Sequence, residues 1–318
     1  MDATADHVPD GVGALARHLA EGLIGHEVLI ERLLIGVLAG GHLLIEGAPG
    51  LAKTRAVKRL AEAMDGSFAR IQCTPDLMPS DLTGTPVFRP QSGTFEFVPG
   101  PVFHNLVLVD EINRAPPKVQ SALLEAMAEG QVTSGNATMR LPDPFLVVAT
   151  QNPIEHDGTF PLPEAQLDRF LMHVVLRLPD PATERRILDL VEAEGQGVQA
   201  APMSLSLEEV RAARKDAMAV HLSAPLRDYI VRLVTATRSD SHAQDIDHAV
   251  SPRGSLALAG AAKARAYLKG RDFALPEDVA EVAGDALAHR MVMTWRAVAE
   301  GRTARALIAD VVATVEAL

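Results

Sequence analysis

Four residues in two separate segments of the chain could together bind a nucleoside triphosphate and a divalent cation. Lys53 and Thr54 follow a loop that contains glycine and proline. Asp110 and Glu111 follow a run of four apolar residues. An ammonium group binds phosphate oxygens, whereas a hydroxyl and a carboxylate supply the oxygen ligands that Mg²⁺ prefers. Because the second carboxylate can accept a proton from an attacking water, these residue types predict hydrolysis of a phosphoanhydride.

The segment before Lys53 has the layout of a phosphate-binding loop between a buried strand and a helix. Glycines allow the backbone to turn sharply and to expose successive N–H groups. The helix predicted to begin near Lys53 points its unpaired N–H groups and its positive dipole end at the same anion. Lys53 would reach the β- and γ-phosphates, and Thr54 would bind Mg²⁺. The residues assigned to this loop are Gly47, Ala48, Pro49, Gly50, Leu51, Ala52, Lys53 and Thr54.

The loop departs from the general pattern at Ala52, where glycine is usual. Alanine tolerates the right-handed helical conformation, so we expect the helix to begin normally. The methyl group would lie where the backbone approaches phosphate most closely. Taken alone, the loop could also be a chance glycine-rich turn, and the remaining motifs decide between these interpretations.

The two acids follow a strand that the sequence predicts to be buried on both faces. The continuous apolar run 106–109 is typical of a parallel sheet. Its carboxyl end is where open α/β sheets bind ligands. Asp110 would hold Mg²⁺, and Glu111 would orient the attacking water and accept its proton. The alternative is an acidic strand end that caps the next helix.

Three further polar residues are candidates for the same chemistry. Asn152 ends the next apolar strand and could bind the attacking water or the γ-phosphate, although Asn-Pro is also a plain turn signal. Arg169 could stabilise the equatorial phosphate oxygens, often from a neighbouring subunit, or could form a surface pair with Asp168. Arg253 lies in the first turn of a predicted helix, where an acid is preferred, which indicates a functional position.

The elements that position these residues divide the chain into two parts. Up to residue 178, strands alternate with helices, which predicts a doubly wound parallel α/β sheet. From 179 to 318 we expect helices throughout, with a flexible connector at 192–197, Trp295 in the core and Leu256 on a packing face. Ser206 with Glu209 predicts a capping box. The expected strands are 43–46, 68–73, 106–109, 145–150 and 172–176, with hairpins around 87–98 and 131–140.

The composition argues against several function classes. The formal charge of −11 opposes nonspecific binding of nucleic acid. The acidic N-terminus, 1–6, lacks the apolar core of a signal peptide, and no apolar run approaches the ~20 residues of a membrane span. Cys73 is the sole cysteine, so no intrachain disulfide can form. The histidines lack metal-ligand spacing. We expect a cytoplasmic protein.

The chain resembles the MoxR family of AAA+ ATPases over residues 24 to 288. The resemblance implies a P-loop αβα core followed by an all-α lid domain, and alanine before the lysine is usual in this family. The motifs that carry it are Gly47-Ala48-Pro49-Gly50-Leu51-Ala52-Lys53-Thr54, Val109-Asp110-Glu111-Ile112-Asn113-Arg114, Gln151-Asn152-Pro153-Ile154-Glu155, Leu162 through Phe170, and Ser251-Pro252-Arg253.

The resemblance also implies a role for each motif. Lys53 and Thr54 match Walker A, and Asp110 and Glu111 match Walker B. Asn152 resembles sensor 1, Arg169 an arginine finger that acts in trans, and Arg253 sensor 2 on the lid. Ile24 and Gly25 resemble the segment that lines the adenine. The stretch 75–101 is similar to a helix-2 insert and 131–140 to a pre-sensor-1 insert, both facing a pore or a partner.

The function that follows is Mg²⁺-dependent ATP hydrolysis that drives chaperone-like remodelling or maturation of protein partners. The family implies a homo-oligomeric ring, a hexamer, and a client protein such as one with a von Willebrand factor A domain. One alternative is a nucleic-acid motor of the helicase type, although the two hairpins carry only Arg89 and Arg140 as basic residues. Another is a chelatase-type subunit that drives metal insertion into a cofactor. A switch that binds ATP without hydrolysing it is disfavoured because both acids are present.

Overall fold

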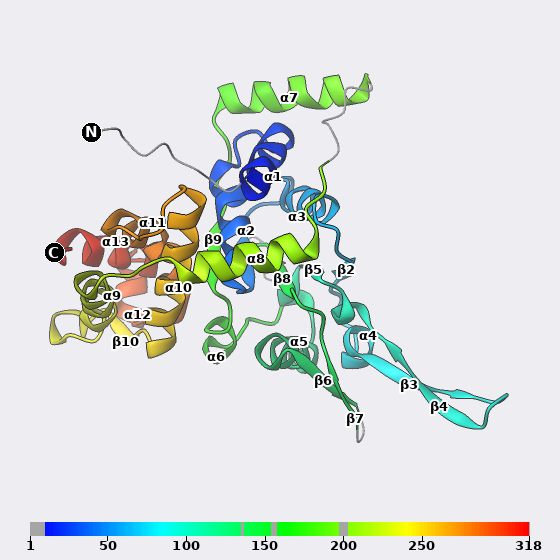
Figure 1. The fold of residues 1–318 in the computed structure, drawn as a ribbon. Coiled ribbons are helices and arrows are strands. Elements are labelled where there is room, and N and C mark those ends of the chain that lie inside the picture. Colours follow the sequence, from blue (N-terminus) through cyan, green and yellow to red (C-terminus); the bar gives the residue numbers. More distant parts are fainter. Residues whose placement is uncertain (1–9, 135–136, 154–157, 197–202, 318) are drawn as a thin grey trace.

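A five-stranded parallel sheet lies at the centre of the first part of the chain. The computed structural model describes residues 10–134, 137–153, 158–196 and 203–317 (Figure 1). Residues 1–6, in which the sequence predicts no signal peptide, lie outside these ranges. The strand order is β2-β5-β8-β1-β9, so the loop after β1 lies beside the end of β8. The strands are β1 Leu43–Glu46, β2 Phe68–Gln72, β5 Leu106–Asp110, β8 Leu146–Gln151 and β9 Met172–Val175.

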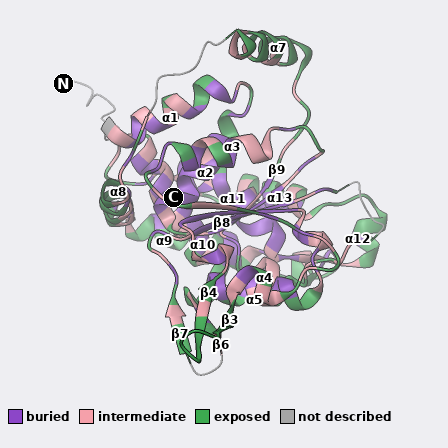
Figure 2. Ribbon diagram, turned by 90° about the vertical axis from the view of Figure 1, so that its right-hand side faces the viewer, coloured by how far each residue is buried: buried purple, intermediate pink, exposed green. Residues whose placement is uncertain are grey.

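Helices cover both faces of this sheet, which explains the apolar runs. Alternate side chains of a strand point to opposite faces. Leu43 and Ile45 accordingly pack in the core beneath α1–α3, whereas Leu44 packs in a second core with α5. The buried strands lie in the middle of the molecule (Figure 2). The parallel α/β fold predicted from the sequence is confirmed. The helices of this part are α1 Asp10–Gly22, α2 Glu27–Ala39, α3 Lys53–Glu62, α4 Pro79–Thr83, α5 Pro117–Glu129 and α6 Glu164–Leu167.

Two hairpins project from the sheet domain on the same side (Figure 1). The longer one joins β3 Gly84–Arg89 to β4 Thr94–Pro99, and the shorter one joins β6 Gln131–Ser134 to β7 Ala137–Arg140. Both were predicted. The longer hairpin is largely exposed and carries an aromatic pair, Phe88 and Phe95, with ring centroids 5.3 Å apart.

The second part of the chain is mainly helical, but four expectations about it were wrong. Strands β10 Ile246–His248 and β11 Val292–Met293 form a small antiparallel sheet. Helix α7 continues to Gly195, through most of the expected connector, whose last residue, 197, lies outside the described ranges. Trp295 is 84% exposed and Leu256 is 74% exposed, because both lie on outward helix faces. The helices are α7 Pro181–Gly195, α8 Leu207–Ala219, α9 Ala224–Ala236, α10 Pro252–Leu268, α11 Pro276–Leu287, α12 Trp295–Ala299 and α13 Ala304–Thr314.

The predicted start signal of α8 is confirmed. Ser206 accepts a hydrogen bond from the backbone N–H of Glu209, and the Glu209 carboxylate accepts one from the Ser206 N–H, which forms the predicted capping box. Short 3₁₀ turns at Pro101–Phe103, Ile112–Arg114, Asp240–His242 and Ala288–Arg290 connect other elements. Among the described residues, no helix combines the length and the apolar character needed to cross a membrane.

Buried ion pairs attach the helical part to the sheet part. Arg32 on α2 is 2.7 Å from Asp285 on α11, and its side chain is 3% exposed. Arg305 on α13 is 2.6 Å from the same carboxylate and also donates to the backbone oxygen of His173 on β9. Removing one partner of a buried pair leaves an uncompensated charge, so such a cluster strongly fixes how the helices dock.

Candidate active site

The loop after β1 and the end of β5 converge on one cavity. The Thr54 hydroxyl is 3.5 Å from Asp110 Oδ1. A cavity of about 400 Å³ lies between them and is lined by residues 49–55, Arg70, Gln72, Asp110, Glu111, Thr150 and Asn152. Gly47 and Ala48 lead into the loop from β1 and do not line this cavity. The structure therefore brings together Lys53, Thr54, Asp110, Glu111 and Asn152, as the sequence predicted.

Ala52 does not adopt the right-handed conformation that we expected. Its φ is 51° and its ψ is 18°, in the left-handed region, and α3 begins at the next residue. This conformation costs an L-residue roughly 1–2 kcal/mol, which is the physical reason glycine is usual at this position. The turn is required because the backbone must reverse from the loop into the helix. Lys53 Nζ donates a 2.5 Å hydrogen bond to the Gly47 oxygen, across the mouth of the loop.

Glu111 is also held in a left-handed conformation, with φ 57° and ψ 52°. Its backbone N–H donates to Thr150 Oγ1 at 3.0 Å. Its carboxylate accepts from Gln72 Nε2 at 3.1 Å and from Arg114 at 3.2 Å. Strained backbone that the surroundings stabilise is frequent at functional sites. The bend turns the Glu111 side chain out of the strand and into the cavity.

Asp110 lies deeper in the cavity and is 6% exposed. Its Oδ1 accepts from Thr150 Oγ1 at 3.2 Å, and its Oδ2 is 2.7 Å from Arg70 Nε. The Thr54 hydroxyl and the Asp110 carboxylate together form a hard oxygen donor pair beside the loop, which fits Mg²⁺. The pKa of the nearby Cys73 thiol is raised to about 12. Burial is the largest cause, and the negative charges of Asp110 and Glu111 add to it.

Three residues of this site were missed by the sequence reasoning. Arg70 and Gln72 are two residues apart on β2, and Thr150 is the last residue of the predicted strand 145–150. The available signal was the pair of polar side chains at alternate positions near the carboxyl end of β2. Residues two apart on a strand share one face, so both side chains could point to the site. Which strand lies beside β5 is decided by the topology, so that signal could not be read in advance.

Comparison with known proteins agrees with this geometry. Residues 42–172 match the model of the ATPase family associated with various cellular activities (AAA), and residues 238–311 match an AAA lid domain. The chaperone MoxR1 of Mycobacterium tuberculosis is 44% identical over 92% of this chain and 78% of its own length. The protein MoxR of Methylorubrum extorquens is 32% identical over 92% of this chain and 90% of its own length. The chain belongs to the MoxR family of AAA+ ATPases.

A solved structure supports the same conclusion for the fold. The crystal structure of "a putative ATPase" from Cytophaga hutchinsonii superposes with a TM-score of 0.89 at 43% identity, covering 96% of this chain and 94% of that one. The AAA+ core followed by a helical lid, expected from the sequence, is thereby confirmed for this MoxR-family chain.

Two of the predicted arginines lie away from the cavity. Arg169 is exposed and donates to the Leu124 backbone oxygen at 2.6 Å. Arg253 is 63% exposed at its side chain and lies 3.5 Å from Asp168 Oδ2. Asp168 is also ion-paired with the buried Arg290, so the structure shows two lid arginines on this carboxylate instead of a local pair with Arg169. In the MoxR-family chain, neither Arg169 nor Arg253 lines the cavity formed by its own loop.

The segment expected to line the adenine lies under α7. Ile24 and Gly25 do not line the loop cavity either. A Cβ at Gly25, whose φ is +76°, would be 2.2 Å from Thr183 Cγ2 on α7. Arg55 of α3 is ion-paired with Glu194 near the other end of α7. Helix α7 therefore contacts the region beside the loop at both of its ends.

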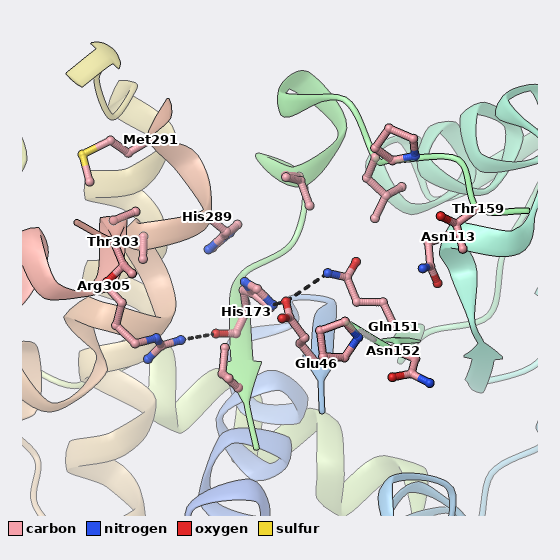
Figure 3. Close-up of a pocket in the computed structure, with 17 residues that line it drawn as sticks. Glu46, Asn113, Gln151, Asn152, Thr159, His173, His289, Met291, Thr303 and Arg305 are labelled. Carbon is pink, nitrogen blue, oxygen red and sulfur yellow. Dashed lines mark hydrogen bonds and ion pairs between the residues drawn. The ribbon is translucent and has the colours of Figure 1, made fainter. Parts of the chain in front are cut away.

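A second and larger cavity, of about 670 Å³, lies between the sheet and the lid (Figure 3). Its floor is formed at the strand ends, where Glu46 accepts from Gln151 at 3.0 Å and lies 2.9 Å from His173 Nε2. The hydrogen bond from His173 is the main cause of a lowered Glu46 pKa. His289 is on the lid side, and burial holds its pKa well below the ordinary value. Arg305 of α13 donates to the backbone oxygen of His173 at 2.9 Å, so this network connects the lid to β1, whose last residue, Glu46, precedes the loop.

Proposed function

We propose that this chain hydrolyses ATP with Mg²⁺ in the loop cavity. The observation that carries the proposal is the convergence of Thr54 and Asp110, with Lys53 and Glu111 lining the same space. Membership of an ATPase family supports it.

Residues 47–54 form the loop that binds the phosphates, and 49–54 of it line the cavity. Backbone N–H groups of the loop and of the start of α3 would donate to phosphate oxygens. When nucleotide binds, Lys53 would release the Gly47 oxygen and would donate to the β- and γ-phosphates. Thr54 and Asp110 would hold Mg²⁺, which supplies charge neutralisation on the phosphate oxygens.

Glu111 acts as the base that receives a proton from the attacking water. Its carboxylate is about one-third exposed, lines the cavity and is supported by Gln72 and Arg114. Asn152 lines the same cavity, is 7% exposed and would orient the water by a hydrogen bond. Positioning and charge complementarity of this kind account for most catalysis of phosphoryl transfer.

A ring of identical subunits, a hexamer, completes the site. Arg169 lies outside its own cavity, so we assign it to the nucleotide of a neighbouring subunit as the finger, and we assign Arg253 to sensor 2 on the lid. Ile24 and Gly25 are assigned to the adenine side. The core domain is proposed to comprise 1–178 and the lid domain 179–318. These assignments follow the motif positions in the family.

The energy of hydrolysis is proposed to remodel or mature a protein client, plausibly one with a von Willebrand factor A domain. One relative is named a chaperone. The exposed hairpin at β3–β4 offers an apolar tip for a protein surface. Its Arg89 is already ion-paired with Glu96 at 2.6 Å, which leaves little basic charge for nucleic acid.

The test is the Glu111→Gln variant, compared with Glu125→Gln, an exposed position on α5. Loss of the base should lower hydrolysis by about 10²–10⁴-fold while ATP binding stays near wild type. The control variant should hydrolyse ATP normally. Hydrolysis at the wild-type rate by Glu111→Gln would remove this residue from its role. The non-hydrolysing variant would also retain a bound client for a pull-down.

A further inference from the structure

The loop cavity is lined by a positively charged side chain, Arg70, that does not belong to the phosphate-binding loop. Arg70 lies on β2, and its side chain points to the same face as Gln72, two residues along the strand. Both line the cavity. Arg70 Nε is 2.7 Å from Asp110 Oδ2, and Arg70 NH2 donates to Gln72 Oε1 at 3.3 Å.

Asp110 therefore has two different partners, one on each carboxylate oxygen. Oδ1 faces the hydroxyls of Thr54 and Thr150, at 3.5 and 3.2 Å. Oδ2 faces the guanidinium of Arg70. A cation held by Thr54 and Asp110 would share one carboxylate with a second positive charge, and like charges a few ångströms apart repel. The guanidinium and the metal ion cannot both make their best contact with Asp110.

The Arg70 side chain is able to leave this contact. It is 53% exposed, its ion pair is open to solvent on one side, and its remaining hydrogen bond is made to a neutral amide. An arginine on an edge strand whose side chain is already more than half exposed can move into solvent without disturbing the core. Half-exposed ion pairs of this kind are also weak.

We propose that Arg70 competes with Mg²⁺ for the Asp110 carboxylate and thereby sets the metal concentration at which ATP is bound. This inference rests on the proposed function of the cavity. It makes Arg70 a positioning residue, which acts through Asp110 and does not touch the substrate. Two effects follow: removing Arg70 should make Mg²⁺ easier to bind, and it should leave Asp110 as an unpaired negative charge beside the phosphates when metal is absent.

The experiment measures binding of a fluorescent, non-hydrolysable ATP analogue to the full chain while MgCl₂ is titrated. For Arg70→Gln, the half-saturating Mg²⁺ concentration should fall about two- to fivefold, the range expected for a half-exposed ion pair. In EDTA the same variant should bind the analogue more weakly than wild type, because Asp110 then lacks its cationic partner beside the phosphates. A general loss of structure would not lower the Mg²⁺ requirement while weakening binding of the analogue in EDTA.

Two matched variants sharpen the result. Arg89→Gln is the same substitution at an arginine that is 48% exposed and 2.6 Å from a carboxylate, but on the β3–β4 hairpin, and it should not shift the Mg²⁺ requirement. Arg70→Lys keeps the charge and should shift it less than Arg70→Gln. Arg70→Gln with an unchanged or raised Mg²⁺ requirement, or with equal or tighter binding in EDTA, would overturn the competition. Wild-type protein that binds no analogue at all would instead overturn the proposed function.

Discussion

Thr54 and Asp110 are 56 positions apart in the sequence, yet the Thr54 hydroxyl is 3.5 Å from Asp110 Oδ1. Thr54 is the second residue of α3, and Asp110 is the last residue of β5. Parallel strands bring their carboxyl ends to one edge of the sheet, and the loop after β1 bends over that edge. This contact is the geometric basis for placing a metal-bound triphosphate in the cavity.

Replacing Thr54 by valine should raise the Mg²⁺ concentration needed for ATP binding by about tenfold or more, because valine has the same shape but no oxygen ligand. Thr54→Ser keeps the hydroxyl and should stay near wild type. Titration of nucleotide binding with MgCl₂ measures both. Equal metal requirements for the two variants would show that the hydroxyl does not contact the metal.

Ala52 is strained, and the strain can be measured. Ala52→Val should destabilise the fold by about 2 kcal/mol, since a β-branched residue is a clear outlier at positive φ. Ala52→Gly should stay within about 1 kcal/mol of wild type, because relief of strain is offset by greater freedom of the unfolded chain. Urea unfolding gives both values. Ala212→Val, at an exposed helical position, is the control and should cost well under 1 kcal/mol.

His42 makes the stability of the core depend on pH. Its Nε2 donates to the Met127 oxygen at 3.1 Å, and its Nδ1 accepts from the Val147 N–H at 3.0 Å. This neutral form uses both ring nitrogens, and burial lowers the pKa of His42 from 6.5 to about 4. Protonation would remove the acceptor of the Val147 N–H.

The unfolded chain therefore binds a proton at His42 more readily than the folded chain. The stabilisation is complete above the unfolded pKa and is lost as the pH falls from 6.5 towards 4. Between pH 7 and pH 5 the wild type should lose about 2 kcal/mol through this residue, and His42→Gln should not show that loss. Urea unfolding at several pH values measures it. His248→Gln, at a side chain that is 70% exposed, should keep the wild-type pH profile.

Arg32 is expected to be essential for docking of the lid. Its side chain is 3% exposed and contacts Asp285 and Glu281 on α11. Arg32→Met should destabilise the protein by about 3–5 kcal/mol, because acidic groups are left without their buried partner. Arg296→Met removes an exposed helical pair with Glu300 and should cost less than about 0.5 kcal/mol. Similar losses in the two variants would mean that the buried cluster contributes little.

Arg169 can be assigned to a neighbouring subunit by complementation. Arg169→Ala and Lys53→Ala should each be inactive alone. In an equimolar mixture, about a quarter of the interfaces in a ring would pair an intact loop with an intact arginine, so part of the ATPase activity should return. A mixture as inactive as its components would argue against action in trans.

The apolar runs at β5 and β8 and the loop ending in Lys53 were sufficient to predict the parallel sheet and to place Lys53, Thr54 and Asp110 at one cavity. A strand buried on both faces has few alternatives to a parallel sheet, and the strand, loop and helix signals are all local. The same local reasoning failed for Trp295 and Leu256. Aromatic or aliphatic character predicts burial on average, but whether a neighbouring helix covers a given face depends on packing between distant segments.

The sequence by itself determined which residues could hold a triphosphate, because glycine, lysine, hydroxyl and carboxylate positions follow from chemistry and spacing along single elements. Only the tertiary structure decided that Arg70 and Gln72 of β2 reach the two acids, that Ala52 is in the left-handed region, and that Arg253 pairs with Asp168. These depend on strand order, on the turn into α3 and on lid docking. Such features arise from contacts between segments far apart in the chain, and no local pattern encodes them.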